Sequence, residues 1–277
     1  MYKKFILWLL PLGILIYGYY PTFVWMADRW LARDSYFGHG ILIPFISLYW
    51  VLRKRKECST LSKNSEPWGL LILLAGVGLQ IFSSVLQVYF LSAISLVWIL
   101  LGAVLFLFGR RVLKQVWFPI CFLLLMVPFP ILFISEITLK LKFFVTEISV
   151  FCLKSMGIHA TREGSYLYMP HSYLIVGDPC SGLRSLLAFL ILGLVFSYGS
   201  GLNGWRRAIV VASGFPLALV SNIGRVLFLA LVSEIYGMNW AHGVVHDASG
   251  VAAFLFAIAI FLAIRRKLET PPVPVMR

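Results

Sequence analysis

The chain has 277 residues, of which 60% are hydrophobic and only 13% are charged, and its formal net charge is +13. Soluble domains are about half apolar and a quarter charged, so this composition excludes an ordinary soluble protein and indicates a polytopic membrane protein. The basic residues gather in short segments between long apolar runs, so we interpret the charge as a topology signal and not as a nucleic-acid-binding surface.

The apolar runs predict an all-α integral membrane protein. A membrane-spanning helix needs about 20 mostly apolar residues, and the runs accommodate about eight such helices in one domain, residues 1–277, with a disordered tail from about 268. In the first half we predict helices at Phe5–Met26, Gly40–Leu52 and Val116–Ile134. Two further helices fit the uncharged stretch Pro67–Gly109, with a turn marked by the polar residues between Gln80 and Gln87.

The second half begins with a segment of a different kind. Charged residues interrupt Ile134–Ile158 at helical spacing, which predicts an amphipathic helix on the membrane surface. Ser165–Val176 then predicts two short strands, a hairpin around Pro170. The last three spanning helices are predicted at Ser181–Tyr198, Ala208–Ile235 and His246–Ile264.

The loop charges predict the orientation of these helices. Lysine and arginine are concentrated on the side that carries both termini, and the richer side is cytoplasmic. Cys180 then lies at the outer end of the sixth helix, Arg225 in the outer half of the seventh, and His246 at the outer end of the eighth. Topology therefore brings a nucleophile, a cation and a titratable base to one membrane depth, a combination sufficient for acyl transfer.

Each of these residues also has an ordinary structural explanation. Among the four cysteines, Cys58, Cys121, Cys152 and Cys180, a buried one usually acts as a small hydrophobe. A cation inside a spanning segment costs about 3 kcal/mol, although Arg225 could reach the outer interface along its stem.

For the base, His242 is a rival of His246, and Asp247 could pair with either. His39 belongs to the same outer face, and Arg184 follows Cys180 by one helical turn, where a cation favours thiolate.

Several motifs resemble the exosortase/archaeosortase family of multi-spanning membrane transpeptidases. They include Ser35-Tyr-Phe-Gly-His39-Gly, Val127-Pro-Phe-Pro, Cys180-Ser-Gly-Leu-Arg184, Asn222-Ile-Gly-Arg225-Val, and His246 with Gly250 and Phe254. The resemblance covers most of the chain, and the histidine in the third place is the bacterial exosortase pattern.

The resemblance implies a cysteine transpeptidase of the bacterial inner membrane, with its active site on the periplasmic face. Its partners would be exported proteins ending in a Pro-Glu-Pro-like motif, a spanning helix and a basic tail, together with an unidentified surface acceptor. Catalytic roles would fall on Cys180, Arg225 and His246, and supporting roles on Arg184, Asn222 and His39. The chemistry requires no metal or organic cofactor.

Two other classes of function remain open on the sequence. An anion-binding transporter would use Arg225 and predicts flux that survives loss of the thiol, although we find no internal repeat of the kind that transporters often show. A non-catalytic assembly factor for polymer export would predict that Cys180→Ser has no effect.

Overall fold

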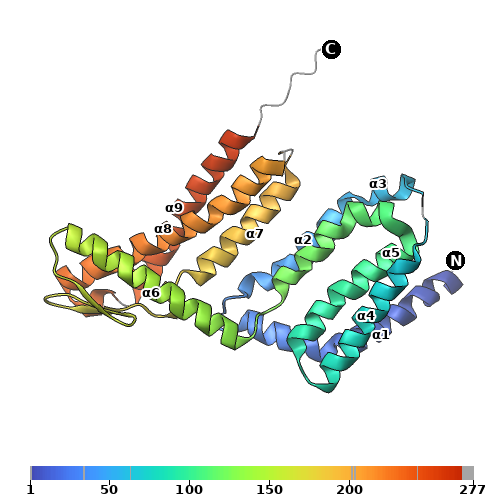
Figure 1. The fold of residues 1–277 in the computed structure, drawn as a ribbon, viewed down its shortest axis with the longest axis horizontal. Coiled ribbons are helices and arrows are strands. Elements are labelled where there is room, and N and C mark those ends of the chain that lie inside the picture. Colours follow the sequence, from blue (N-terminus) through green and yellow to red (C-terminus); the bar gives the residue numbers. More distant parts are fainter. Residues whose placement is uncertain are drawn as a thin grey trace, which may run out of the picture. The chain divides into compact units, whose positions relative to one another are not determined.

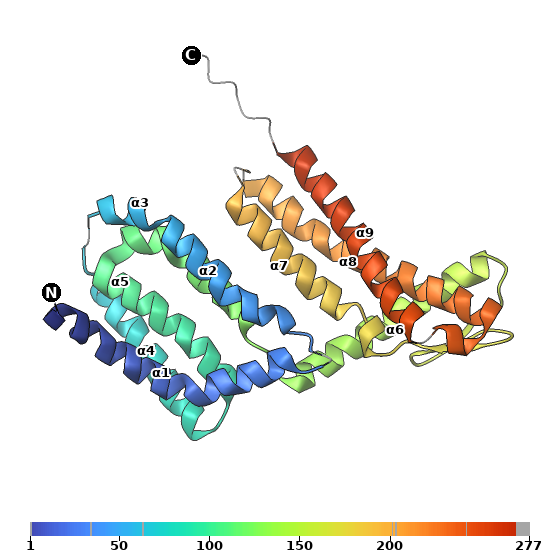
Figure 2. The ribbon, with the colours of Figure 1, turned by 180° about the vertical axis from the view of Figure 1, so that it is seen from behind.

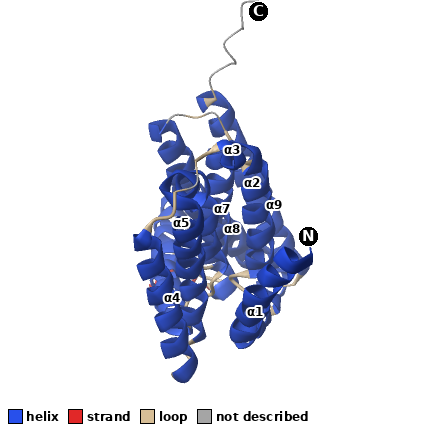
Figure 3. Ribbon diagram, turned by 90° about the vertical axis from the view of Figure 1, so that its right-hand side faces the viewer, coloured by secondary structure: helices blue, strands red, loops and turns tan. Residues whose placement is uncertain are grey.

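A computed structural model describes residues 2–33, 35–62, 64–200, 202, 204–241 and 243–269. The described chain is mainly helical (Figure 3). It divides into two compact units, Met1–Pro130 and Ile131–Arg277. The assignment of the whole chain to one domain stays a prediction.

The first unit contains five α-helices and two short 3₁₀ helices among its described residues (Figure 1). In chain order they are α1 (Tyr2–Leu31), η1 (Gly38–Ile41), α2 (Leu42–Arg53), α3 (Arg55–Thr60), α4 (Pro67–Val85), α5 (Tyr89–Phe122) and η2 (Leu123–Met126). The segments predicted before residue 67 are confirmed as helices with shifted ends, while their crossing of the membrane stays a prediction. The short helix α3 was not predicted.

A buried polar cluster joins α1, α4 and α5. Oε1 of Gln80 accepts hydrogen bonds from the hydroxyls of Ser92 at 2.6 Å and Ser95 at 3.0 Å. Tyr19 and Thr22 of α1 lie 2.6 Å from the same two serine hydroxyls. Because polar groups within a bilayer need protein partners, these bonds hold the three helices together.

The same cluster corrects the predicted turn between α4 and α5. Gln80 lies inside α4, and the two helices are instead joined at residues 86–88. The sequence suggested a turn because a run of polar residues usually marks one, but here the glutamine is satisfied inside the helix packing.

The predicted helix Val116–Ile134 is wrong in its bounds. Helix α5 passes a kink at Gly109 and continues to Phe122, so the basic residues after Gly109 are helical and do not form a loop. After η2 the chain is not helical at residues 127–130. Pro128 and Pro130 explain this break, since proline lacks the N–H donor and keeps the preceding residue out of the α conformation.

The second unit begins with α6 and a small sheet, followed by three long helices. Its elements are α6 (Ile131–Ser155), β1 (Thr161–Glu163), β2 (Tyr166–Tyr168), β3 (Tyr173–Ile175), η3 (Asp178–Cys180), α7 (Leu183–Gly199), α8 (Gly204–Tyr236), η4 (Met238–Ala241) and α9 (Val244–Leu268). The hairpin of β2 and β3 confirms the prediction, while β1 adds an unpredicted third antiparallel strand.

Helix α8 is at the centre of this unit. It packs between α7 and α9, and the three lie side by side in both Figure 1 and Figure 2. It also contacts α6 and β3. One buried cluster joins Leu167 and Leu174 of the sheet to Val226 and Leu229 of α8, and Cys180 belongs to it. This packing places the turn that contains Cys180 against α8.

Apolar length supports an integral membrane protein. Among the described residues, four helical segments are long and apolar enough to cross a membrane: α4, residues 89–126, α8 and α9; α7 is apolar but shorter. The total of about eight spans stays a prediction, as does the surface position of α6. Helix α9 includes Leu268, the first residue of the predicted tail, and residues 270–277 lie outside the described part.

Candidate active site

Cys180 ends the 3₁₀ turn η3, two residues before α7 begins. The residue is only 5% exposed. The amide Nδ2 of Asn222, on α8, donates a 2.6 Å hydrogen bond to the carbonyl oxygen of Cys180. Gly182 allows this approach: its φ of +83° suits glycine, and a Cβ there would come within 3.1 Å of the Asn222 amide. The cysteine is therefore anchored through its backbone to α8.

Asp178 ties the same turn to α6. Its carboxylate forms an ion pair with the ammonium group of Lys142, whose side chain is mostly buried. The hydroxyl of Ser181 donates to the Asp178 carbonyl oxygen at 2.8 Å. The turn that contains Cys180 is therefore held on both sides, by α8 and by α6.

His246 is the third residue of α9 and faces the cysteine. Its Nε2 lies 3.1 Å from Sγ of Cys180, within hydrogen-bond reach for sulfur. Its Nδ1 lies 3.2 Å from a carboxylate oxygen of Asp247. Asp247 is 86% exposed, so this second contact is weakened by solvent. In the tautomer with its proton on Nδ1, Nε2 would be available to accept the thiol proton.

Arg225 of α8 covers the same imidazole. Its Nη2 lies 3.3 Å from Nδ1 and 3.2 Å from Nε2 of His246. A nitrogen equally distant from both, if it were in the ring plane, would overlap a ring carbon, so the guanidinium lies over the ring face. The same Nη2 donates to the His246 carbonyl oxygen at 3.0 Å. Arg225 therefore approaches the Cys–His pair without occupying the ring's in-plane positions.

Two small residues of α9 make room for this arginine. A Cβ at Gly250 would lie 3.0 Å from Cζ of Arg225, so only glycine leaves the present space. Nε of Arg225 is 3.4 Å from the hydroxyl of Ser249, which donates to the His246 carbonyl oxygen at 2.8 Å. The guanidinium is thus held against the first turns of α9.

Opposing effects act on the cysteine's acidity. Burial raises the pKa of the Cys180 thiol above its usual value, and the nearby Arg225 guanidinium lowers it in part. The net shift is upward, which favours the protonated thiol. A thiol acting as a nucleophile would need a base to take its proton, and His246 Nε2 lies within reach of the sulfur.

The other predicted residues are placed as follows. Arg184 lies in the first turn of α7 and is half-buried. His39 lies in η1, in the first unit; burial lowers its pKa, and a hydrogen bond with the backbone of Leu125 opposes this shift. The supporting roles of both stay predictions. His242, the rival base, lies outside the described residues.

Sequence reasoning missed two contributors. The Lys142–Asp178 ion pair and the Ser249 hydroxyl joined to both Arg225 and the His246 backbone were not anticipated. Lys142 looked like one of several charges on an amphipathic helix, and no sequence pattern connects it to residue 178.

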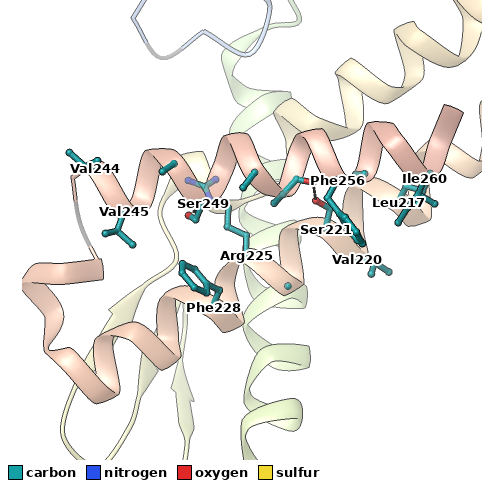
Figure 4. A pocket seen from close by; sticks show the side chains of 15 residues that line it. Leu217, Val220, Ser221, Arg225, Phe228, Val244, Val245, Ser249, Phe256 and Ile260 are labelled. Carbon is teal, nitrogen blue, oxygen red and sulfur yellow. Dashed lines mark hydrogen bonds between the residues drawn. The ribbon is translucent and has the colours of Figure 1, made fainter. Parts of the chain in front are cut away.

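An apolar groove of about 710 Å³ runs between α8 and α9 and includes Arg225 (Figure 4). Figure 4 shows Arg225 and Ser249 in the middle of an otherwise mostly apolar row that extends from Val244 to Ile260. Gly224, Ala248, Ala252 and Ala253 contribute small surfaces to its lining. The groove is therefore mostly apolar, and Arg225, a cationic group in its lining, also contacts His246.

Together these features define an integral membrane protein with a buried cysteine paired to a histidine beside an arginine. The family model of the transmembrane exosortases matches residues 25–263, and the chain belongs to this family. Membership supports a general role as a membrane transpeptidase of the cysteine type. No curated protein and no solved structure matches the chain.

Proposed function

We propose that the protein cleaves C-terminal sorting signals of exported proteins through a thioester on Cys180 and passes the new C-terminus to a surface acceptor. The observation that carries this proposal is the 3.1 Å approach of Cys180 Sγ to His246 Nε2, with Arg225 over the imidazole. A thiol within reach of a base is an arrangement that nucleophilic acyl transfer uses, and a nearby cation can stabilise the oxyanion.

In the first half-reaction the Cys180 sulfur attacks the scissile carbonyl carbon while its proton passes to His246 Nε2. A carbon–sulfur bond forms and the carbonyl oxygen becomes negative. The positively charged Arg225 guanidinium stabilises this oxyanion. His246 then returns the proton to the leaving amine as the carbon–nitrogen bond breaks, which leaves a thioester.

In the second half-reaction an amine or hydroxyl acceptor, or water, attacks the thioester. His246 takes the acceptor's proton and returns it to the departing sulfur, so the thiol is restored. A histidine suits this double role because its ordinary pKa lies near neutral pH. The geometry supports the division of labour, since the in-plane nitrogen faces the thiol and Arg225 lies above the ring.

The groove between α8 and α9 supports a place for the substrate's spanning helix. Its lining is mostly apolar and follows two candidate membrane spans, and small residues let another helix approach closely. A helix in this groove would pass beside Arg225. The proposal sets the protein in the bacterial inner membrane, with both termini in the cytoplasm and the site on the periplasmic side.

The direct test follows processing of a candidate substrate with a Pro-Glu-Pro-like motif, a helix and a basic tail. Cys180→Ala, Arg225→Ala and His246→Ala are each expected to abolish cleavage while the full-length protein remains in the membrane. His242→Ala is the comparison and is expected to be mild. Normal processing by Cys180→Ala would exclude the thioester. Loss of activity in His242→Ala but not in His246→Ala would show that His246 is not the base.

A further inference from the structure

A second cavity, of about 440 Å³, lies in the first unit and is lined mainly by polar side chains. Its lining residues are Ser62, Asn64, Glu66, Arg110, Arg111 and Lys114. They come from the segment that precedes α4 and from the first turns of α5 beyond its kink. Neither the Cys180 site nor the α8–α9 groove includes any of these residues.

The kink at Gly109 builds this cavity. Gly109 has φ +82°, and a Cβ there would overlap the carbonyl oxygen of Asn64, so the segment before α4 packs directly on the α5 backbone. Helix α4 begins at Pro67, and the second part of α5 begins at Arg110. Two helix N-termini, each with a partial positive charge, therefore lie close to the cavity.

The charge balance of the lining is strongly positive. Arg110, Arg111 and Lys114 contribute three cations, against the one carboxylate of Glu66. Within the described part of the chain, none of the three cations forms an ion pair. An anion bound here would relieve the mutual repulsion of the cations.

Neutral hydrogen-bonding groups complete the lining. The hydroxyl of Ser62 donates to Oδ1 of Asn64 at 2.9 Å, and this bond directs the Asn64 amide nitrogen to serve as a donor. The cavity adjoins one end of α4 and of the first part of α5, two candidate membrane spans. Ends of spanning helices meet the bilayer at headgroup depth, where basic pockets recognise phosphate groups.

We propose that this cavity binds a phosphate group, carried by an anionic phospholipid or present as free phosphate. Basic residues at a helix end would by themselves reflect only orientation in the membrane. The specific feature here is that a glycine-dependent kink gathers an amide donor and three cations around one cavity, and these cations form no ion pair with any described residue. The site is independent of the proposed peptide chemistry.

The lipid arm measures retention of dioleoylphosphatidylglycerol by the purified full-length protein, using native mass spectrometry, with dioleoylglycerol as the phosphate-free comparison. The free-phosphate arm follows thermal unfolding with added inorganic phosphate against chloride at equal ionic strength. Preferential retention of the phospholipid identifies a headgroup, whereas protection by inorganic phosphate alone identifies free phosphate as the ligand.

The test variant carries Arg110→Gln, Arg111→Gln and Lys114→Gln. Its matched control, Arg53→Gln with Arg266→Gln and Lys267→Gln, removes the same charge from exposed positions outside the cavity. Each cation is expected to contribute about fivefold to the affinity for a phosphate group. The test variant should therefore bind its phosphate-bearing probe on the order of a hundredfold more weakly, while the affinity of the control variant changes little.

A second variant, Gly109→Ala, keeps every cation but crowds Asn64, and it is expected to weaken binding as well. Equal binding by the wild type and the triple test variant would overturn the proposal. So would an equal loss in the matched control, or a wild type that binds neither probe in preference to its comparison.

Discussion

Replacing Gly250 by alanine tests the position of Arg225. A Cβ at residue 250 would lie 3.0 Å from Cζ, 3.1 Å from Nη2 and 3.3 Å from Nε of the guanidinium. Contacts between non-bonded heavy atoms are most favourable at about 3.5–4.0 Å, so the guanidinium must move by about half an ångström. It can move because it is the end of a flexible side chain, and it would then lie off the face of His246.

The two effects of this change differ in sign and size. Alanine is favoured over glycine in a helix interior by about 1 kcal/mol, and crowding of a packed side chain costs about 1–3 kcal/mol. The free energy of unfolding is therefore expected to change by only about 1 kcal/mol. A misplacement of about 1 Å can cost about a hundredfold in rate, so half that displacement predicts a loss on the order of tenfold.

The assay compares the substrate-cleavage rate and thermal stability of Gly250→Ala with those of the wild type. Gly78→Ala is the matched control because Gly78 also lies in a helix and a Cβ there would meet nothing within 4 Å. The control is expected to cleave at the wild-type rate. An unimpaired cleavage rate in Gly250→Ala would refute the reasoning that the present guanidinium position is required.

Three further predictions follow from the same contacts. Since Arg225 lowers the pKa of the buried Cys180 thiol, Arg225→Gln should shift the pH profile of iodoacetamide alkylation to higher pH; an unchanged profile would show that the cation does not act on the sulfur. Asn222→Ala removes the hydrogen bond to the Cys180 carbonyl oxygen, so it should lower the free energy of unfolding by about 1–3 kcal/mol and slow cleavage. Urea unfolding and cleavage kinetics measure these effects, and wild-type values of both would show that Asn222 does not hold the Cys180 turn. Lys142→Asp should impair cleavage and Lys142→Asp with Asp178→Lys should recover part of it, whereas equal activity of the single and double variants would show that the ion pair is unimportant.

The sequence predicted the second unit better than the first. Apolar runs between charged segments predicted α7, α8 and α9, although α8 includes Arg206 and Arg207 and α9 includes Arg265–Lys267, which the sequence placed outside the helices. The same charges predicted that Cys180, Arg225 and His246 share one membrane depth. The structure brings these three side chains together. Depth alone, however, does not define which atoms meet, so the sequence could not predict that Arg225 lies over the imidazole ring of His246.

The errors in the first unit have two physical causes. A positive φ at Gly109 lets the chain turn sharply and remain helical, which composition does not reveal. Gln80 is polar yet lies inside α4, because its partners on α5 are distant in sequence and satisfy it. The Lys142–Asp178 ion pair also joins residues that are distant in sequence, so no sequence pattern predicted it.

The central claim is that Cys180 forms a thioester with the substrate, and trapping that adduct tests it most directly. The protein is co-expressed with a substrate that ends in a Pro-Glu-Pro-like motif, a helix and a basic tail, and Cys180 is examined by mass spectrometry before and after hydroxylamine. The account predicts a hydroxylamine-labile acyl group on Cys180, absent from Cys180→Ala. Cleavage of the substrate with no such adduct, and at the same rate in Cys180→Ala, would contradict it.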